Sequence, residues 1–140
     1  MRRAIWSVLT TDPGFTALLP ADRLFRVGGY GVDHTILPVD PEEGPFGFIH
    51  YSIHSPGMGR ITTRNLSLNV HDKLGSYTDI ELVLKAAREA FRSVQYPYVA
   101  DDGTFLNSAS WNGDGPDDFD TGWGTLTKTS TWTVVGSGEE

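Results

Sequence analysis

The chain opens with an apolar pattern of helical period. One face of a helix over the first ten positions collects Ala4, Ile5, Val8 and Leu9. Asp12-Pro13 then predicts the end of this helix and the start of a short helical turn, because aspartate is a preferred N-cap residue and proline suits the first turn. Pro20 ends that turn. We therefore expect a short N-terminal helical segment.

Patterns of period two follow and predict strands. A short strand is expected at Arg23–Val27, before a run of glycines that breaks regular structure. Alternation resumes at Phe46–His54 and again at Ile61–His71, and the turn residues Ser55–Gly59 lie between these two stretches. Neighbouring strands joined by a short turn favour an antiparallel hairpin.

The clearest helical pattern runs over Tyr77–Gln95. Its buried stripe consists of Ile80, Val83, Leu84, Ala87, Phe91 and Val94. Thr78 and Glu81 have the spacing of a capping box, in which each side chain bonds a backbone N–H at the start of the helix. Glu81 also stands four residues before Lys85, which predicts an exposed ion pair. We expect this helix to pack on a sheet.

Two more strands are predicted near the C-terminus, at Gly103–Trp111 and Gly124–Val135. Between these strands lies an acidic stretch rich in glycine and aspartate, and residues 101–124 are expected to form a loop inserted between them. In the last strand one face holds Thr125, Thr127, Thr129, Thr131 and Thr133, and the other holds Leu126, Lys128, Ser130, Trp132 and Val134. The threonine face suits solvent or a partner, and the tryptophan face suits the core.

The order of these elements predicts an α+β fold. We expect an antiparallel sheet of four to five strands, packed by one long helix and the short N-terminal helical segment. Residues 1–140 are expected to form a single domain, because a chain of 140 residues has the size of one ordinary domain.

Charge is unevenly distributed along the chain. There are 18 acidic and 11 basic side chains, a net charge of −7, and no cysteine, which excludes disulfides and thiolate metal sites. No Lys or Arg lies between Arg92 and Lys128. This window instead contains Asp101, Asp102, Asp114, Asp117, Asp118 and Asp120. Specific nucleic-acid binding is disfavoured because it needs clustered basic residues, and no apolar run approaches the ~18 residues of a membrane span.

Motifs of common catalytic sites are absent from the sequence. It contains no Gly-x-Ser-x-Gly, no Gly-Lys-Ser/Thr phosphate loop and no His-Glu-x-x-His. His50 and His54 lie on one face of a predicted strand, but about 13 Å apart, which is too far for one metal ion. His34 and His71 stand in other segments. We therefore expect no enzyme, no cofactor and no metal site.

Residues 1–95 contain a series of short segments in a characteristic order. They are Ile5, Leu9, Asp12-Pro13, Leu18-Leu19, Arg23-Leu24-Phe25, Pro45-Phe46-Gly47-Phe48-Ile49, Leu66 through Asp72, Ser76-Tyr77, and a helix with Ile80, Leu84 and Ala87. In this order the chain resembles the tail terminator, or tail completion, proteins of long-tailed bacteriophages. The resemblance covers about two thirds of the chain.

The resemblance implies a structural virion protein assembled in the host cytoplasm. Such a subunit forms a ring, typically a hexamer, on the head-proximal end of the tail tube. The ring stops tube polymerisation and presents the surface that joins the head. The implied partners are other copies of the chain, the tail tube protein and the head-tail connector or neck proteins. DNA passes only as cargo, without specific binding, and no membrane is involved.

The acidic residues 101–124 match no part of that family pattern. Carboxylates that line a ring repel the phosphates of passing DNA, and aromatics beside them suit a protein interface. We therefore predict a lumen or subunit interface formed by Asp101, Asp102, Asp114, Asp117, Asp118, Asp120, Trp111, Phe119 and Trp123.

Two alternatives fit the same sequence. Within the virion, a head-tail connector or another neck protein has nearly the same requirements. From a different class, a small carbohydrate- or calcium-binding module would use Trp111, Trp123 and the aspartates. The calcium version lacks the ligand order of an EF-hand loop.

Overall fold

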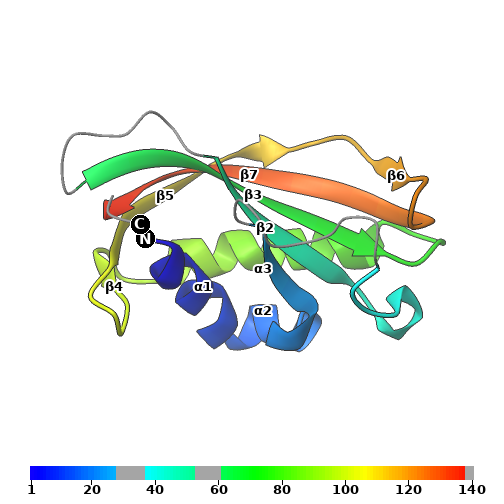
Figure 1. Cartoon of the computed structure of the whole chain (residues 1–140), viewed down its shortest axis with the longest axis horizontal. Helices are drawn as coiled ribbons and strands as arrows, with labels where there is room; N and C mark the ends of the chain where they lie inside the picture. Colours follow the sequence, from blue (N-terminus) through cyan, green and yellow to red (C-terminus); the bar gives the residue numbers. More distant parts are fainter. Residues whose placement is uncertain (28–36, 53–60, 138–140) are drawn as a thin grey trace.

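A computed structural model describes residues 1–27, 37–52 and 61–137. The helices are α1 (Arg2–Thr11), α2 (Pro13–Leu18) and α3 (Thr78–Ser93), with short 3-10 turns at Ala21–Arg23 and Pro41–Glu43. The strands are β1 (Leu24–Val27), β2 (Phe46–Ser52), β3 (Ile61–Asp72), β4 (Tyr98–Val99), β5 (Phe105–Asp114), β6 (Asp118–Asp120) and β7 (Thr125–Ser137). The sheet arches over the helices, which lie against one of its faces (Figure 1).

The α+β class is confirmed, but the sheet has more strands than predicted and is not entirely antiparallel. Within the described residues the sheet has seven strands in the order β1-β2-β3-β7-β5-β4, and β6 pairs with β7. β1 runs parallel to β2, whereas the other pairs are antiparallel. Residues 28–45 join β1 to β2, long enough for a crossover that returns the chain in the same direction.

Two strands were missed because their own sequences carry no strand pattern. β4 has two residues, and β6 has the three residues Asp118–Asp120. Aspartate is depleted in strands, so β6 depends on its pairing with the long strand β7. The strand predicted at Gly103–Trp111 is confirmed as β5, which continues to Asp114, so the segment 101–124 is not one loop but contains β5 and β6.

The predicted antiparallel pairing of β2 with β3 and the N-terminal helices are confirmed, whereas the predicted turn Ser55–Gly59 lies outside the described residues. β2 pairs antiparallel with β3, and Phe46 lies opposite His71. α1 buries the four apolar residues of its predicted stripe. Asp12 caps α2, since its Oδ1 accepts a hydrogen bond from the backbone N–H of Phe15 at 2.9 Å.

The core lies between the helices and the covered face of the sheet. α3 buries Ile80, Val83, Leu84, Ala87, Ala90 and Phe91. From the sheet, alternate residues of β3 and β7 meet this stripe, among them Leu68 and Trp132. The rings of Phe91 and Trp132 have centroids 5.3 Å apart, so the last turn of α3 is fixed over the middle of β7.

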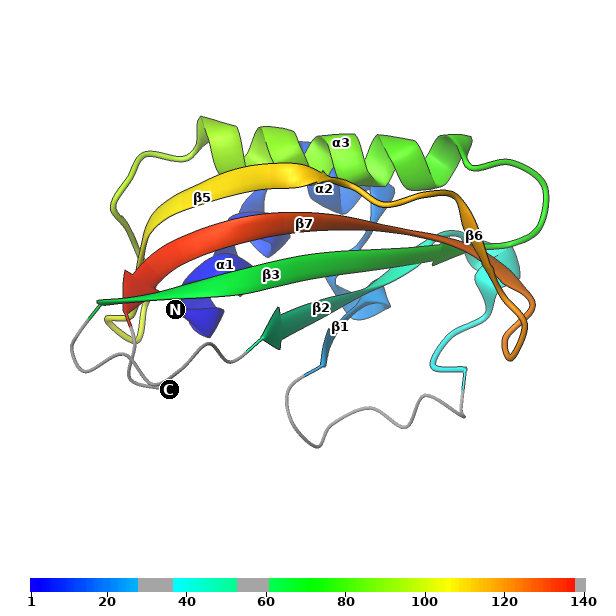
Figure 2. The same cartoon turned by 90° about the horizontal axis from the view of Figure 1, so that it is seen from above.

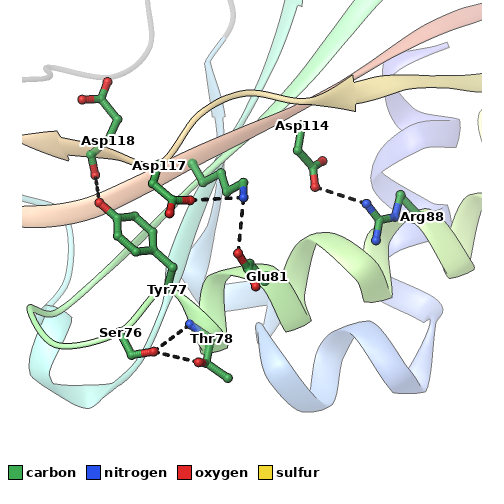
Figure 3. A network of polar contacts seen from close by, with 9 residues as sticks. Ser76, Tyr77, Thr78, Glu81, Arg88, Asp114, Asp117 and Asp118 are labelled. Carbon is green, nitrogen blue, oxygen red and sulfur yellow. Dashed lines mark hydrogen bonds and ion pairs between the residues drawn. The ribbon is translucent and has the colours of Figure 1, made fainter.

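The capping box predicted for α3 is wrong. Thr78 is the first residue of the helix rather than its cap, and its backbone N–H donates to Ser76 Oγ at 3.1 Å (Figure 3). Glu81 points away from the helix start to Lys128 Nζ, 3.3 Å away, instead of pairing with Lys85. Lys128 lies on the covered face of β7, and its partly buried ammonium group is neutralised by nearby carboxylates.

Candidate functional site

The acidic residues of 101–124 form two groups at opposite ends of the sheet. Asp101 and Asp102 precede β5, whereas Asp114 ends β5 and the other aspartates lie in or next to β6. Ten residues of strand span about 30 Å. Figure 2 places β6 at the far end of the sheet from the start of β5. A continuous acidic stretch in the sequence thus becomes two separate acidic sites.

The first site is tied to the N-terminal helix. Arg3 donates from Nε and Nη2 to the two carboxylate oxygens of Asp101, each at 3.0 Å. This hydrogen bonding holds the pKa of Asp101 below its usual range and raises the pKa of Arg3. Asp102 accepts from the backbone N–H and the hydroxyl of Thr104 at 3.0 and 2.6 Å, which lowers the pKa of Asp102. These groups are exposed, so their main effect is to fix the turn.

At the second site, two basic side chains bind the carboxylates of Asp114 and Asp117, between the end of β5 and the start of β6. Arg88 of α3 lies 3.2 Å from Asp114 and 4.5 Å from the ring centre of Trp111. Lys128 contacts Asp117 at 3.2 Å as well as Glu81. The hydrogen bond to Asp117 raises the pKa of Lys128. Figure 3 shows Arg88 of α3 beside Asp114, and Glu81 of α3 linked through one amine to Asp117, just before β6.

Hydrogen bonds at Asp118 and Asp120, one of them from the distant Tyr77, fix the position of β6. The backbone carbonyl of Asp118 accepts from the hydroxyl of Tyr77 at 2.6 Å, and its carboxylate accepts from the N–H of Phe119. Asp120 Oδ1 accepts from the N–H groups of Gly122 and Trp123, both at 2.9 Å. Phe119, between the two aspartates, keeps 45% of its surface exposed.

The three predicted aromatic residues do not form one platform. Trp123 packs on Phe46, Phe48 and His71, on the face of the sheet that the helices leave open. Trp111 lies on the helix-covered side, where its Nε1 donates to Ser130 Oγ at 2.9 Å. Phe119 sits on β6 apart from both. A single sugar-stacking surface made from both tryptophans is therefore excluded by this arrangement.

Two hollows lie on opposite sides of the sheet. The first, about 430 Å³ in volume, lies on the open face and is lined by Phe48, His50, Asn69, Asp120, Trp123 and Thr129 among others. The second, about 320 Å³, lies between α3 and β5. In the described residues no group of three His, Asp or Glu side chains is placed to hold a metal ion. His34 and His54 lie outside those residues.

Sequence reasoning named the acidic and aromatic residues but missed the basic partners that position them. Arg3 and Arg88 lie on helices far from the acidic segment in the sequence, so spacing gives no sign of their contacts. Lys128 did carry a signal. A lysine on the same strand face as Trp132 faces the core, and a cation there needs nearby carboxylates.

No model of a known protein family matches the chain, and no curated protein matches its sequence. The fold is similar to that of a chain in the solved structure "Virion of native gene transfer agent (GTA) particle". The two superpose with a TM-score of 0.63, covering 99% of this chain and 95% of that one, at 10% sequence identity. At this identity the likeness establishes a shared fold. No helix in the described part of the chain has the length and apolar character to cross a membrane.

Proposed function

We infer that this protein is a structural virion protein that forms a ring on the head-proximal end of a phage tail tube. The ring ends tube polymerisation and provides the surface for head joining. The observation that carries this proposal is the near full-length likeness of the fold to a virion chain. The sequence resemblance to tail terminators over residues 1–95 supports the same class independently.

The surface of the fold suits assembly better than catalysis. The open face of the sheet carries hydroxyl and amide side chains from β3 and β7, and these are hydrogen-bonded to one another. Asn69 Nδ2 donates to Thr127 and Thr129 at 2.9 and 2.7 Å. Side chains held in this way offer a fixed polar surface to a neighbouring protein. This fixed polar surface supports a structural role in assembly.

The first acidic site is the better candidate for a ring lumen. Asp102 forms no ion pair among the described residues, and Asp101 shares its charge only with the exposed Arg3. Repeated around a ring axis, such carboxylates repel passing DNA. A structure of the assembled ring with residues 101–104 on its outer rim would contradict this assignment.

A tube-length assay tests the proposed function directly. Purified tail-tube subunits from the same source are polymerised with increasing amounts of this protein, and tube lengths are measured by electron microscopy. We expect shorter tubes with a ring of extra density at one end. Tubes that grow without a cap at saturating protein would reject termination.

A neck protein is the alternative within the same virion class. It would bind connector-bearing heads and leave the length of free tubes unchanged, so the same assay with isolated heads added separates the two roles. Native mass spectrometry near six subunits fits either role.

The open-face hollow favours one further candidate, a carbohydrate-binding module. Trp123 offers an aromatic ring, and Asp120 and Asn69 offer polar groups in a volume of about 430 Å³, within the common range of ligand pockets. A module of this kind would be a monomer whose tryptophan fluorescence changes with soluble glycans. A stable ring without any glycan response would reject it.

A further inference from the structure

Two side chains on the covered face of the sheet are buried with polar atoms that no other group satisfies. Tyr51 of β2 and Arg64 of β3 are each 8% exposed. The buried hydroxyl of Tyr51 and the buried Nε of Arg64 have no hydrogen-bond partner. Arg64 also forms no ion pair in the part of the chain that the structure describes. Because burying a cation or a hydroxyl without a partner costs free energy, these two donors indicate that an acceptor binds beside them.

A second arginine lies at the ring of Tyr51. Arg64 Cζ is 5.7 Å from the ring centre, and Cζ of Arg2, the first residue of α1, is 5.5 Å from it. The register explains the first contact, since Tyr51 pairs with Leu66 and Arg64 is the diagonal neighbour on the same face of β3. We call Arg2, Tyr51 and Arg64 the Tyr51 site.

The hydroxyl of Tyr51 is a hydrogen-bond donor to a ligand at this site. Burial raises the pKa of Tyr51, and the charges of Arg64 and Arg2 only partly offset that rise. The phenol therefore stays protonated at neutral pH. Every polar group of the Tyr51 site is then a donor, and two of the three side chains are cationic. Such a set is suited to an anion that accepts several hydrogen bonds.

The start of α1 carries charge of the opposite sign to the one that a helix N-terminus favours. Its first turn contains Arg2 and Arg3 and no acidic residue, and no side chain caps it. The free N–H groups and the dipole of a first turn stabilise anions and disfavour cations. An anion beside Arg2 would offset this repulsion, so the helix end supports the same conclusion as the buried donors.

The surroundings of the Tyr51 site add further positive charge. Arg26 of β1 lies over Trp6 of α1, with Cζ 4.3 Å from the ring centre, and it forms no ion pair among residues 1–27, 37–52 and 61–137. Burial and the charge of Arg3 lower the pKa of Arg26. The carboxylate of Asp101 is already bound by Arg3. Positive charge therefore gathers at the start of α1 in a chain whose net charge is −7.

Burial and the direction of the donors restrict the kind of anion. Because Tyr51 and Arg64 are almost completely buried, a compact ion reaches their donors, whereas a phosphate within a DNA backbone carries a sugar on both sides. The donors come from two strands and lie beside a helix end. A tetrahedral phosphate accepts hydrogen bonds in several directions and carries more than one negative charge near neutral pH, whereas a carboxylate has two oxygens in one plane.

We propose that the Tyr51 site binds one inorganic phosphate ion, which accepts hydrogen bonds from the Tyr51 hydroxyl and the Arg64 guanidinium and is further neutralised by Arg2. The bound ion ties the start of α1 to β2 and β3. This inference concerns a ligand of the single chain and does not depend on the proposed ring.

Phosphate titration of the purified protein tests the site. Inorganic phosphate is added at pH 7 while sodium chloride keeps the ionic strength constant, and binding is followed by calorimetry and by the melting temperature. We expect one ion per chain and a saturable rise of the melting temperature, as ligand linkage requires. Arg64→Met should weaken phosphate binding at least about tenfold, and Tyr51→Phe, which removes only the hydroxyl, about fivefold.

Control substitutions remove the same groups elsewhere. Arg92→Met removes an exposed arginine at the end of α3, and Tyr98→Phe removes a hydroxyl from β4. Both variants should bind phosphate as the wild type does. Circular dichroism verifies the fold of each variant. If Arg64→Met does not fold, Tyr51→Phe and Arg2→Gln decide the question, since each removes one group of the site and leaves Arg64 in place.

Three results would overturn the proposal. The first is a wild type that shows no saturable phosphate binding. The second is a rise of the melting temperature that is linear in phosphate and equal in all variants, which is the general effect of an excluded salt. The third is saturable binding that Tyr51→Phe, Arg2→Gln and Arg64→Met leave unchanged, since the ion would then bind elsewhere.

Discussion

The helix-covered face and the open face of the same sheet are stabilised by different side chains. On the covered face, Leu66, Leu68 and Trp132 are almost completely buried against α3 and α1. On the open face, Asn69 bridges two threonines of β7, and His71 Nδ1 lies 2.9 Å from Thr125 Oγ1. The covered face therefore supplies most of the hydrophobic stabilisation, whereas the open face holds its polar groups in place by hydrogen bonds between neighbouring strands.

This difference limits where partners can bind. The helices cover most of one face, and the hollow between α3 and β5 lies at the margin of that face. The open face has an aromatic end around Phe46, Phe48 and Trp123 and a polar middle on β3 and β7. Changes on the two faces should consequently differ in size, and four substitutions measure that difference.

The largest effect is expected for Trp132→Ala on the covered face. Trp132 is 1% exposed and packs on Phe91, so its truncation leaves a large cavity and should cost about 3–5 kcal/mol of unfolding free energy. Urea unfolding followed by circular dichroism measures the loss. Thr131→Val, one residue away on the open face, should change stability by less than about 0.5 kcal/mol. Equal losses would contradict the contrast between the faces.

Gly136→Ala tests how tightly the covered face is packed at the end of β7. A Cβ there would lie 2.3 Å from the carbonyl oxygen of Phe105 and 2.8 Å from Met1 Sδ. Because the backbone of β5 is held in the sheet and cannot easily move aside, we expect the unfolding free energy to fall by about 1–3 kcal/mol. Gly115→Ala is the matched control, with its nearest atom at 3.5 Å. A neutral Gly136→Ala in thermal unfolding would show that this end of the sheet adapts.

Asn69→Ala tests the polar network of the open face. The change removes two hydrogen bonds to Thr127 and Thr129, whose hydroxyls can partly be hydrated, so a loss of about 1 kcal/mol is expected. Thr63→Ala, on an exposed part of β3, serves as the control in the same urea titration. A loss as large as that of Trp132→Ala would mean that the open face is a second core.

The smallest effect is a pH dependence at Asp72, which is 3% exposed at the end of β3. Burial raises its pKa above 3.8, Asp79 acts in the same direction, and the backbone N–H of Lys73 and the charges of Lys73 and Arg23 oppose it. The folded state therefore binds the proton more tightly than the unfolded state, and ionising Asp72 costs stability as pH rises from 3.8 through the folded-state pKa.

Asp72→Asn removes this cost at Asp72. We expect the variant to melt slightly higher than the wild type near pH 7, and the advantage to shrink as pH falls toward 4. Calorimetry across pH 4–7, with Asp22→Asn as an exposed control, measures the difference. An advantage that grows toward low pH would show that folding lowers, rather than raises, the pKa of Asp72.

Local patterns predicted most of the elements because their causes are local. The stripe of α3, the cap at Asp12 and the alternation of β7 each depend on neighbours within a few residues. The capping box at Thr78 failed because Ser76, and the distant Lys128, compete for the groups that it required. The parallel pairing of β1 also escaped prediction, since strand direction depends on the path of the connecting chain.

The sequence by itself determined an acidic α+β protein whose charge excess lies after Arg92, with one long amphipathic helix and a last strand of alternating threonines. Tertiary structure alone decided that β5 divides those acids into two sites, that Arg3, Arg88 and Lys128 hold three of them, and that Trp111 and Trp123 lie on opposite faces. Composition and periodicity depend on residues near in sequence, whereas ion pairs and hollows join residues that only the folded chain brings together.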